Sequence, residues 1–296
     1  MAEATEQWTL KRLLDWTKDY FEKVGSDSSR LDAEVLLAEA LQCQRIELYT
    51  RFEEVPPTET LTEYRAWVKR RGAGEPVAYI VGHKEFYSLS FDVTPSVLIP
   101  RPETEHIVVA AIEAAKSISD SPESPIRIID VGTGSACVAI ALAKHIESSV
   151  IAATDLSTDA LEVARGNAAK HEVTDRVRFF TGDLLEALPA GSKPVHLIVS
   201  NPPYIGREEI DTVEETVLKY EPEMALFGGE QGVEIIQRLV DQSVDMLLPG
   251  GKLIFENSPA VFDLCLEIIE KSPLNLVESI KDFAGLGRVI VAEKAK

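Results

Sequence analysis

Apolar residues near the start of the chain recur every three or four positions, as on one face of an α-helix. In residues 8–24 these positions are Leu10, Leu13, Leu14, Trp16 and Phe21. Thr9, just before them, is a residue type that caps helix N-termini. The same spacing predicts helices over residues 29–43, 45–52 and 60–71. In the second of these, the predicted inward positions are Leu31, Val35, Leu36, Ala38 and Leu41. We therefore predict a helical bundle over residues 1–74, with Trp16 and Trp67 in its core.

The pattern changes after residue 74. Aromatic and β-branched residues dominate the next stretch, at Val77, Tyr79, Ile80, Phe86, Tyr87, Leu89, Phe91 and Val93. This composition predicts a β-hairpin linker over residues 75–95. Three prolines (Pro95, Pro100 and Pro102) then bracket a rigid loop, and a helix is predicted to follow it over residues 104–115.

From residue 126 onward, short apolar runs alternate with segments of helical spacing. The runs predict strands over residues 126–131, 150–154, 177–180, 195–200, 252–256, 274–280 and 288–292. The other segments predict helices over residues 137–145, 158–171, 231–247 and 260–271. Such alternation is typical of an α/β domain, here residues 96–296, with a mostly parallel sheet covered by helices on both faces. The close pair of final strands predicts an antiparallel edge.

A glycine turn follows the first of these strands. It reads Gly132-Thr133-Gly134-Ser135-Ala136, and the next strand ends at Asp155, about 20 residues after the turn. Glycine allows the backbone to bend sharply near a ligand, and an acid at the second strand end can accept hydrogen bonds from both ribose hydroxyls. The order of strand, turn, helix, strand and acid therefore favours a cofactor that contains a nucleoside. The full dinucleotide fingerprint is absent, because Cys137 occupies its third glycine position.

A second turn, Asn201-Pro202-Pro203-Tyr204, ends the strand predicted over residues 195–200. Two prolines fix φ twice and remove two backbone donors, so the turn is stiff. The Asn201 side-chain oxygen and the Pro202 carbonyl can both accept hydrogen bonds from one planar NH2 group, and Tyr204 can pack on that group. Asp183, at the end of another predicted strand, can accept a hydrogen bond from an adenine amino group.

Composition limits the class of protein. Over 296 residues, 45% are hydrophobic and 27% charged, as in soluble globular proteins. We expect no membrane-spanning segment, because no apolar run approaches the roughly 20 residues required, and residues 1–10 are not a signal peptide. The three cysteines, Cys43, Cys137 and Cys265, are far apart, so we expect reduced thiols in a cytoplasmic protein and no metal site. A net charge of −19 argues against tight, sequence-specific binding to nucleic acid.

Six segments, taken in order, carry a resemblance to a known family. They are V-L-I-P-R-P-E-T-E, D-V-G-T-G-S, I-V-S-N-P-P-Y-I, Y-E-P-E-M-A-L-F-G-G, L-P-G-G-K-L and D-F-A-G-L-G-R-V. This series resembles the release factor glutamine methyltransferases, the PrmC/HemK family. The N-P-P-Y and G-x-G elements are common to many amino-methyltransferases, whereas their combination with R-P-E-T-E and A-L-F-G-G makes the resemblance specific.

The resemblance implies a Rossmann-like class I methyltransferase fold that uses S-adenosylmethionine and releases S-adenosylhomocysteine. It implies methylation of the side-chain amide of the glutamine in the GGQ motif of class I peptide chain release factors. Carried over by position, the cofactor residues are Gly132, Thr133, Gly134, Ser135, Ala136, Asp155, Asp183, Leu184 and Asn201. The substrate residues are Arg101, Glu103, Thr104, Asn201, Pro202, Pro203 and Tyr204, with Asn201, Pro202 and Tyr204 closest to the chemistry. We expect a monomer whose N-terminal bundle recognises the release factor.

The sequence departs from the family pattern at three places. The glycine turn ends in S-A-C where the family usually has another glycine, which is expected to narrow the space over the cofactor. Asn257-Ser258 follows Glu256 in place of His-Gly, and Gly287 replaces an aspartate.

Three other functions compete with the predicted one: glutamine methylation of a ribosomal protein, methylation of the adenine exocyclic amine, and a non-catalytic scaffold. The R-P-E-T-E and A-L-F-G-G segments argue against a ribosomal-protein substrate, and the net charge argues against adenine methylation. A non-catalytic scaffold is disfavoured because Gly132, Asp155 and Asn201 are intact.

Overall fold

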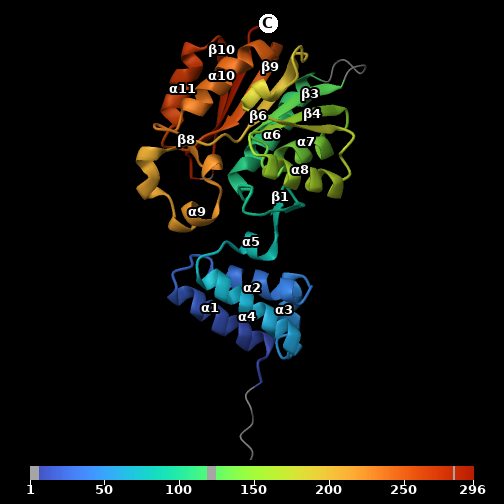
Figure 1. The fold of residues 1–296 in the computed structure, drawn as a ribbon, viewed down its shortest axis with the longest axis vertical. Helices are drawn as coiled ribbons and strands as arrows, with labels where there is room; N and C mark the ends of the chain where they lie inside the picture. The colour runs from blue at the N-terminus through green and yellow to red at the C-terminus, as the bar shows by residue number, and fades with distance from the viewer. Residues whose placement is uncertain (1–6, 119–124, 283) are drawn as a thin grey trace, which may run out of the picture. The chain divides into compact units, whose positions relative to one another are not determined.

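The computed structural model describes residues 7–118, 125–282 and 284–296 (Figure 1). The chain forms two compact units, Met1–Gly82 and His83–Lys296. The division falls at Gly82, inside the linker predicted over residues 75–95. None of the helices in the described ranges is both long and apolar enough to cross a lipid bilayer.

The first unit is helical, as predicted. Its helices are α1 Leu10–Lys23, α2 Ser29–Ala40, α3 Arg45–Thr50, α4 Thr58–Gly72 and α5 Val77–Val81. Thr9 caps α1, because its hydroxyl accepts a hydrogen bond from the Arg12 backbone N–H at 3.4 Å. The core joins Leu10, Leu14 and Phe21 of α1 to residues of α2 and α4. Tyr64 completes it, and the Tyr64 hydroxyl donates a hydrogen bond to the Thr17 hydroxyl at 2.9 Å.

Two predicted core positions of this unit are wrong. The side chain of Trp16 is 51% exposed and that of Leu31 is 45% exposed. Trp16 stacks on Tyr20, with ring centroids 5.5 Å apart, and meets Trp8 edge-on at 6.2 Å. These rings contact one another outside the core, so helical spacing alone did not identify the buried side of α1 at this position.

The hairpin predicted over residues 75–95 is shorter than expected. Residues 77–81 form helix α5, which ends at Gly82 in the left-handed conformation, with φ of +83°. The hairpin itself is β1 His83–Phe86 paired antiparallel with β2 Leu89–Asp92. The prediction of β-structure at Val77 from its aromatic and β-branched neighbours was therefore wrong. The fixed φ of Pro76 is also compatible with the start of a helix.

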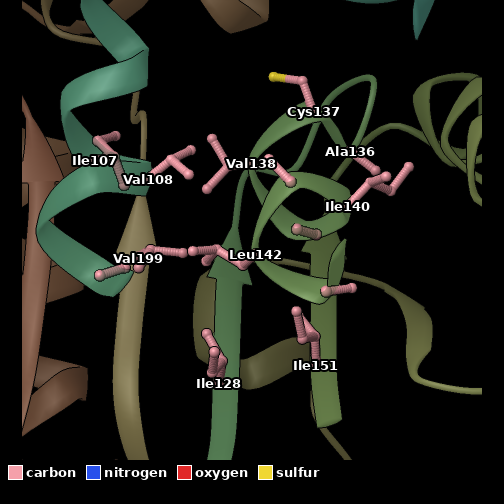
Figure 2. Close-up of a cluster of buried hydrophobic side chains, with 14 of the residues drawn as sticks. Ile107, Val108, Ile128, Ala136, Cys137, Val138, Ile140, Leu142, Ile151 and Val199 are labelled. Atoms are coloured by element: carbon pink, nitrogen blue, oxygen red, sulfur yellow. The ribbon is translucent and has the colours of Figure 1, made fainter. Parts of the chain in front are cut away.

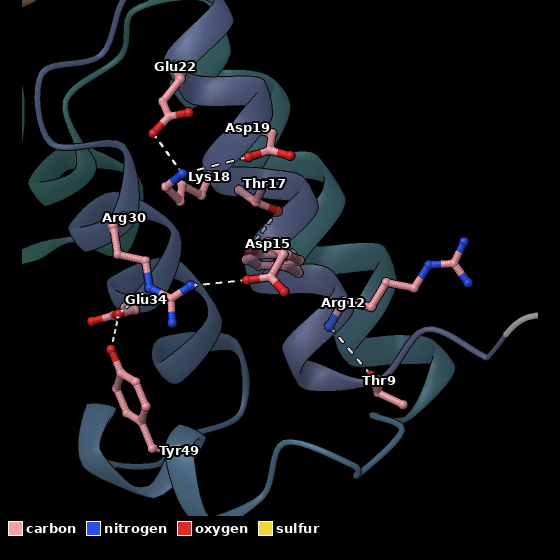
Figure 3. A network of polar contacts seen from close by, with 11 residues as sticks. Thr9, Arg12, Asp15, Thr17, Lys18, Asp19, Glu22, Arg30, Glu34 and Tyr49 are labelled. Atoms are coloured by element: carbon pink, nitrogen blue, oxygen red, sulfur yellow. Dashed lines mark hydrogen bonds and ion pairs between the residues drawn. The ribbon is translucent and has the colours of Figure 1, made fainter.

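Glu34 is a buried carboxylate on α2, and its residue is only 3% exposed. It accepts hydrogen bonds from Arg30 Nε at 2.6 Å and from the Tyr49 hydroxyl, both labelled in Figure 3. A third hydrogen bond comes from Arg45 Nη2 at 3.0 Å. Burial alone would raise the pKa of Glu34, but these hydrogen bonds outweigh burial and hold the pKa below its usual value. The network ties α2 to α3.

The second unit contains the predicted α/β domain. In the described residues its main sheet has seven strands, in the order β10-β11-β9-β6-β3-β4-β5. Their bounds are β3 Ile126–Val131, β4 Ser149–Asp155, β5 Val177–Thr181, β6 Val195–Ser200, β9 Leu247–Glu256, β10 Leu274–Lys281 and β11 Gly287–Lys294. The pairs β10–β11 and β11–β9 are antiparallel, and all other neighbours are parallel. The fold class and the antiparallel edge are confirmed.

Helices cover both faces of this sheet. The principal ones are α6 Glu105–Ile118, α7 Cys137–His145, α8 Thr158–Lys170, α10 Glu234–Met246 and α11 Phe262–Lys271. Alternate residues of each strand point to opposite faces, so Ile128 joins the core under α6, α7 and α8 while Ile129 joins the core under α10 and α11. In Figure 2, Val138 and Leu142 of α7 fill the space between α6 and the strands that carry Ile128 and Val199.

A segment that the sequence analysis left unassigned follows β6. It contains β7 Ile205–Gly206, η3 Arg207–Thr212, α9 Glu215–Tyr220, η4 Glu223–Ala225 and β8 Phe227–Gly229. The short strands β7 and β8 pair in parallel. The A-L-F-G-G motif therefore lies beside the chain that leaves the N-P-P-Y turn.

We predict that Glu34→Gln lowers the free energy of unfolding of the first unit by about 1.5–3 kcal/mol, because charge-assisted hydrogen bonds to a buried carboxylate are lost. The folded pKa lies below the unfolded value. The carboxylate therefore stabilises the unit above the ordinary glutamate pKa, near 4.3, and this contribution is lost as pH falls through the folded pKa.

Thermal unfolding followed by tryptophan fluorescence checks this prediction, because all three tryptophans lie in the first unit. The gap between the parent and Glu34→Gln should close in acid, and Glu63→Gln, on the exposed side of α4, should match the parent at every pH. An equal gap at pH 3 and pH 7 would contradict the assignment.

Candidate active site

The turns after β3, β4, β5 and β6 enclose a cavity of about 330 Å³. These turns lie at the carboxyl ends of parallel strands, where open α/β sheets bind their ligands. The volume is within the usual range for small-molecule sites. The cavity brings together Gly132, Thr133, Gly134 and Ser135 of the glycine turn with Asp155, Asp183, Leu184 and Asn201. All of these residues were assigned to the cofactor from the sequence.

The glycine turn has the conformation that its glycines permit. Gly132 and Gly134 have φ of +70° and +53°, which are left-handed values that a side chain makes costly. Ala136, in the S-A-C stretch, adopts a similar value of +64° directly before α7. Its methyl group is buried in the core under α7, and Ala136 is absent from the residues that line the cavity. Ser135 and Cys137 of the same S-A-C stretch do line the cavity, so the expected narrowing of the space over the cofactor stays a prediction.

Asp130, the penultimate residue of β3, stabilises the glycine turn through hydrogen bonds. Its Oδ2 accepts hydrogen bonds from the Thr133 hydroxyl at 2.6 Å and from the Ala139 backbone N–H at 3.2 Å. Burial raises the pKa of Asp130 to about 6, although both hydrogen bonds favour the ionised form. Asp130 was not among the predicted site residues, and its signal in the sequence was an acid between Ile129 and Val131, two positions before Gly132.

Asp155 connects the second strand end to the glycine turn. Its Oδ2 accepts a hydrogen bond from the Gly134 backbone N–H at 2.8 Å, and its Oδ1 accepts one from the Ser157 backbone N–H at 2.9 Å. Burial raises the pKa of Asp155, and these backbone donors oppose the rise. Each carboxylate oxygen keeps a second lone pair, so the group can still accept hydrogen bonds from a ligand in the cavity.

Asp183 and Leu184 line the same cavity after β5. Oδ2 of Asp183 accepts a hydrogen bond from Arg238 Nη2 of α10 at 2.7 Å, which leaves its other oxygen available for a ligand. Leu184 has a φ of +48°, an unusual value for a side chain with a Cβ. Such strain is typical of positions that a binding site holds in place.

The N-P-P-Y turn is supported by glycines of the following segment. A Cβ atom added to Gly228 would overlap the carbonyl oxygen of Pro203, and one added to Gly232 would overlap that of Tyr204. The Ile205 backbone N–H also donates a hydrogen bond to the Leu226 carbonyl at 3.0 Å. Gly228 of the A-L-F-G-G motif and Gly232 just after it therefore lie so close to the turn that no side chain would fit at either position.

A second cavity, of about 450 Å³, lies on the other side of the turn. Pro202 and Tyr204 line it, together with residues of the segment before and within α9. The two cavities share Leu98, Arg101, Asn201 and Ala225. Asn201 therefore stands at the boundary between them.

The R-P-E-T-E loop contributes differently at each position. Arg101 lines both cavities and forms an ion pair with the buried Glu221. Thr104 lines the first cavity, and its buried hydroxyl accepts a hydrogen bond from Asn201 Nδ2 at 3.0 Å. Glu103 is not among the residues that line either cavity.

Glu256, at the end of β9, completes the polar arrangement and was not among the predicted site residues. Its side chain accepts hydrogen bonds from the Thr104 hydroxyl at 2.6 Å and from the Tyr204 hydroxyl at 3.0 Å. Burial raises the pKa of Glu256, against the effect of these two donors. Burial and the Glu256 charge also raise the pKa of Tyr204, so its hydroxyl keeps its proton.

The first cavity fits S-adenosylmethionine, the cofactor that the resemblance implies. It joins a flexible glycine turn, an acid at the second strand end and an acid at the third. Thr154, also in its lining, has a buried hydroxyl oxygen without a hydrogen-bond partner among the described residues. A polar atom of this kind is expected where a ligand supplies the partner.

Two family models match the sequence. Residues 12–82 match the PrmC N-terminal domain, and residues 117–230 match the methyltransferase small domain. A relative from Rhodopirellula baltica is 45% identical over 100% of both chains and is named release factor glutamine methyltransferase. Relatives of the same name from Koribacter versatilis, 40% identical over 97% of this chain and 99% of theirs, and Bacillus subtilis, 35% identical over 96% and 97%, agree.

Solved structures support the fold. A methyltransferase from Pyrococcus furiosus has a TM-score of 0.53 and 20% identity, over 79% of this chain and 100% of that one. The N-terminal domain of human METTL16 in complex with SAH has a TM-score of 0.51 and 19% identity, over 77% and 84%.

We predict that Asp155→Ala weakens S-adenosylmethionine binding by roughly 1.5–3 kcal/mol, or about one to two orders of magnitude in Kd, because a charged acceptor is lost. Isothermal titration calorimetry measures the change. Asp245→Ala, which removes an exposed acid from α10, is the matched control and should leave the Kd unaltered. A parent-like Kd for Asp155→Ala would show that this carboxylate does not bind the cofactor.

Proposed function

This chain belongs to the release factor glutamine methyltransferase family, and from that premise we propose that it methylates the glutamine of the GGQ motif in class I peptide chain release factors. It is an S-adenosylmethionine-dependent protein methyltransferase, and S-adenosylhomocysteine is the other product. We further propose that it acts as a monomer in the cytoplasm; Cys43, Cys137 and Cys265 are free thiols, which is usual in that compartment.

The observation that carries the proposal is the position of Asn201 between two cavities. Gly132, Asp155 and Asp183 give the first cavity the features of a nucleoside site. The second cavity, lined by Pro202 and Tyr204, offers a route for a glutamine side chain. A substrate amide that enters by the second cavity would meet the cofactor at Asn201.

The chemistry needs orientation more than it needs a base. An amide nitrogen is a weak nucleophile, because its lone pair is delocalised into the carbonyl group. The bound cofactor supplies an electrophilic sulfonium methyl group. Asn201 Nδ2 donates to Thr104, so Asn201 Oδ1 can accept a hydrogen bond from the substrate NH2. The Pro202 carbonyl can accept from the second N–H, and together the two acceptors hold the nitrogen in line.

We also propose that the helical bundle recognises the release factor. A cavity of about 410 Å³ on this unit is lined by Trp8, Trp16 and Tyr20, with Arg65 and Lys69 beside them. Exposed tryptophan, tyrosine and arginine side chains are the residues that most often dominate protein interfaces. A short GGQ loop offers few contacts, so a large protein substrate gains affinity from a second surface.

The test of the function is mass spectrometry of a release factor after incubation with this protein and S-adenosylmethionine. We expect one methyl group on the GGQ glutamine with the parent. With Asn201→Ala we expect kcat to fall at least about 100-fold, because the substrate nitrogen is no longer oriented.

The cofactor Kd of Asn201→Ala should stay close to the parent value, because the glycine turn and Asp155 are intact. A release factor whose GGQ glutamine is replaced by glutamate is the substrate control. Methylation at another residue would refute the proposed substrate site, and equal losses of cofactor affinity and kcat would refute the role of Asn201.

We predict that Trp16→Ala lowers kcat/KM about 10–30-fold on a whole release factor and changes it less than twofold on a short GGQ peptide, because only the protein contacts the bundle. Ile46→Ala, which removes the most exposed large apolar side chain of α3, is the control and should affect neither substrate. Equal losses on protein and peptide, with a lower Tm, would mean that Trp16 serves the stability of the bundle.

A further inference from the structure

Glu256 forms the inner end of a chain of hydrogen bonds that reaches Asn201. The residue is 1% exposed, and its two oxygens accept from different hydroxyl groups. Oε2 accepts from Thr104 at 2.6 Å, and Oε1 accepts from Tyr204 at 3.0 Å. The Thr104 oxygen in turn accepts from Asn201 Nδ2 at 3.0 Å. The two partners of the carboxylate, Thr104 and Tyr204, come from different parts of the sequence, and Thr104 extends the chain of hydrogen bonds to Asn201.

The carboxylate determines the direction of this chain. An ionised carboxylate can only accept hydrogen bonds, and 2.6 Å is typical of a hydroxyl that donates to one. Burial raises the pKa of Glu256, whereas the two hydroxyl donors and then the charge of Arg288 favour the ionised form. Thr104 has a single hydroxyl hydrogen, which it gives to Glu256, so toward Asn201 it can only accept. Asn201 must then present its NH2 group to Thr104.

From this geometry we propose that Glu256, acting through Thr104, is a positioning residue that selects which end of the Asn201 amide faces the substrate. With Nδ2 committed to Thr104, Oδ1 is directed to the incoming glutamine. We call the hydrogen-bond chain Glu256–Thr104–Asn201 the relay. If its direction were reversed, the NH2 group of Asn201 would face the NH2 group of the substrate, and neither group could accept a hydrogen bond from the other. The kinetic consequence rests on the proposed function, whereas the orientation of the amide is a property of the chain alone.

A purely structural role for Glu256 would have different effects. A carboxylate that only satisfies two buried hydroxyls would contribute to stability without controlling Asn201. Replacement by glutamine separates the two roles, because the Nε2 of glutamine can donate to Thr104. Thr104 would then donate its hydrogen to Asn201 and turn the amide around.

The experiment compares Glu256→Gln, Thr104→Val and Thr104→Ser on a short GGQ peptide at saturating cofactor. We expect kcat to fall at least about tenfold in Glu256→Gln and in Thr104→Val, with the cofactor Kd within about twofold of the parent. Thr104→Ser keeps the hydroxyl and should retain most of the parent kcat. The double variant Glu256→Gln/Thr104→Val should be no slower than the slower single variant, because both break one relay.

Ser243→Ala is the matched control for stability. Ser243 is a buried hydroxyl of α10 that donates to the Leu239 carbonyl at 2.6 Å, away from both cavities. Its loss should lower Tm and leave kcat unaltered. If Glu256→Gln also lowers only Tm, or if Thr104→Ser is as slow as Thr104→Val, the relay is refuted.

A second measurement does not depend on activity. The side-chain NH2 signal of Asn201, identified in an NMR spectrum by its loss in Asn201→Asp, reports on the amide directly. We expect its exchange with solvent to be at least about tenfold faster in Glu256→Gln than in the parent, since the NH2 group then faces the open cavities. Equal exchange rates refute the relay. A parent that methylates no release factor but shows this difference refutes only the proposed substrate.

Discussion

The candidate site depends on a close approach between two stretches of backbone. The N-P-P-Y turn has lost two N–H donors to proline and cannot join a helix or a longer strand. The glycines of the next segment hold it instead, because Gly228 and Gly232 lie against the carbonyl groups of Pro203 and Tyr204 at distances that exclude a Cβ atom. A turn held in this way keeps the backbone of Asn201 at the boundary of two cavities, and the hydrogen bond to Thr104 then orients its side chain.

Buried acids provide the remaining rigidity, and each accepts hydrogen bonds from neighbouring donors in the folded structure. Asp130 supports the glycine turn through Thr133, Asp155 binds the Gly134 backbone, and Glu256 holds Thr104. Burial raises the pKa of all three carboxyl groups, so each costs free energy when ionised. A buried acid with two fitting donors is nevertheless more costly to remove singly than to keep, since its donors would be left unpaired. The strand ends thus hold the acids, and the acids hold the loops that surround the cavities.

Local chemistry made some elements predictable and long-range contact made others unpredictable. The bounds of β3, α7 and β6 match the prediction, because glycine or proline turns punctuate these elements. The prediction that Trp16 is buried was wrong, because helical spacing identifies the apolar face of a helix but not which edge of that face is buried by neighbouring helices. Glu256 was missed for a different reason: its partner Thr104 is 152 residues away, and no local pattern marks a pair at that separation. The segment containing β7, α9 and β8 lacks a clear period, and its form depends on the turn that it supports.

The arrangement also explains why an amide, and not a carboxylate, stands at the meeting point of the cavities. A carboxylate at the position of Asn201 would accept hydrogen bonds equally well, but it would lie against a positively charged cofactor. Attraction of that kind would favour the positively charged cofactor before the reaction over the transition state, in which this charge is diminished, and so it would not help the chemical step. Thr104 lies between the charge of Glu256 and Asn201. Because Thr104 donates its hydroxyl hydrogen to Glu256, it accepts a hydrogen bond from Asn201. The neutral oxygen of Asn201 can then orient the substrate nitrogen without strongly stabilising the positive charge of the cofactor, which methyl transfer removes.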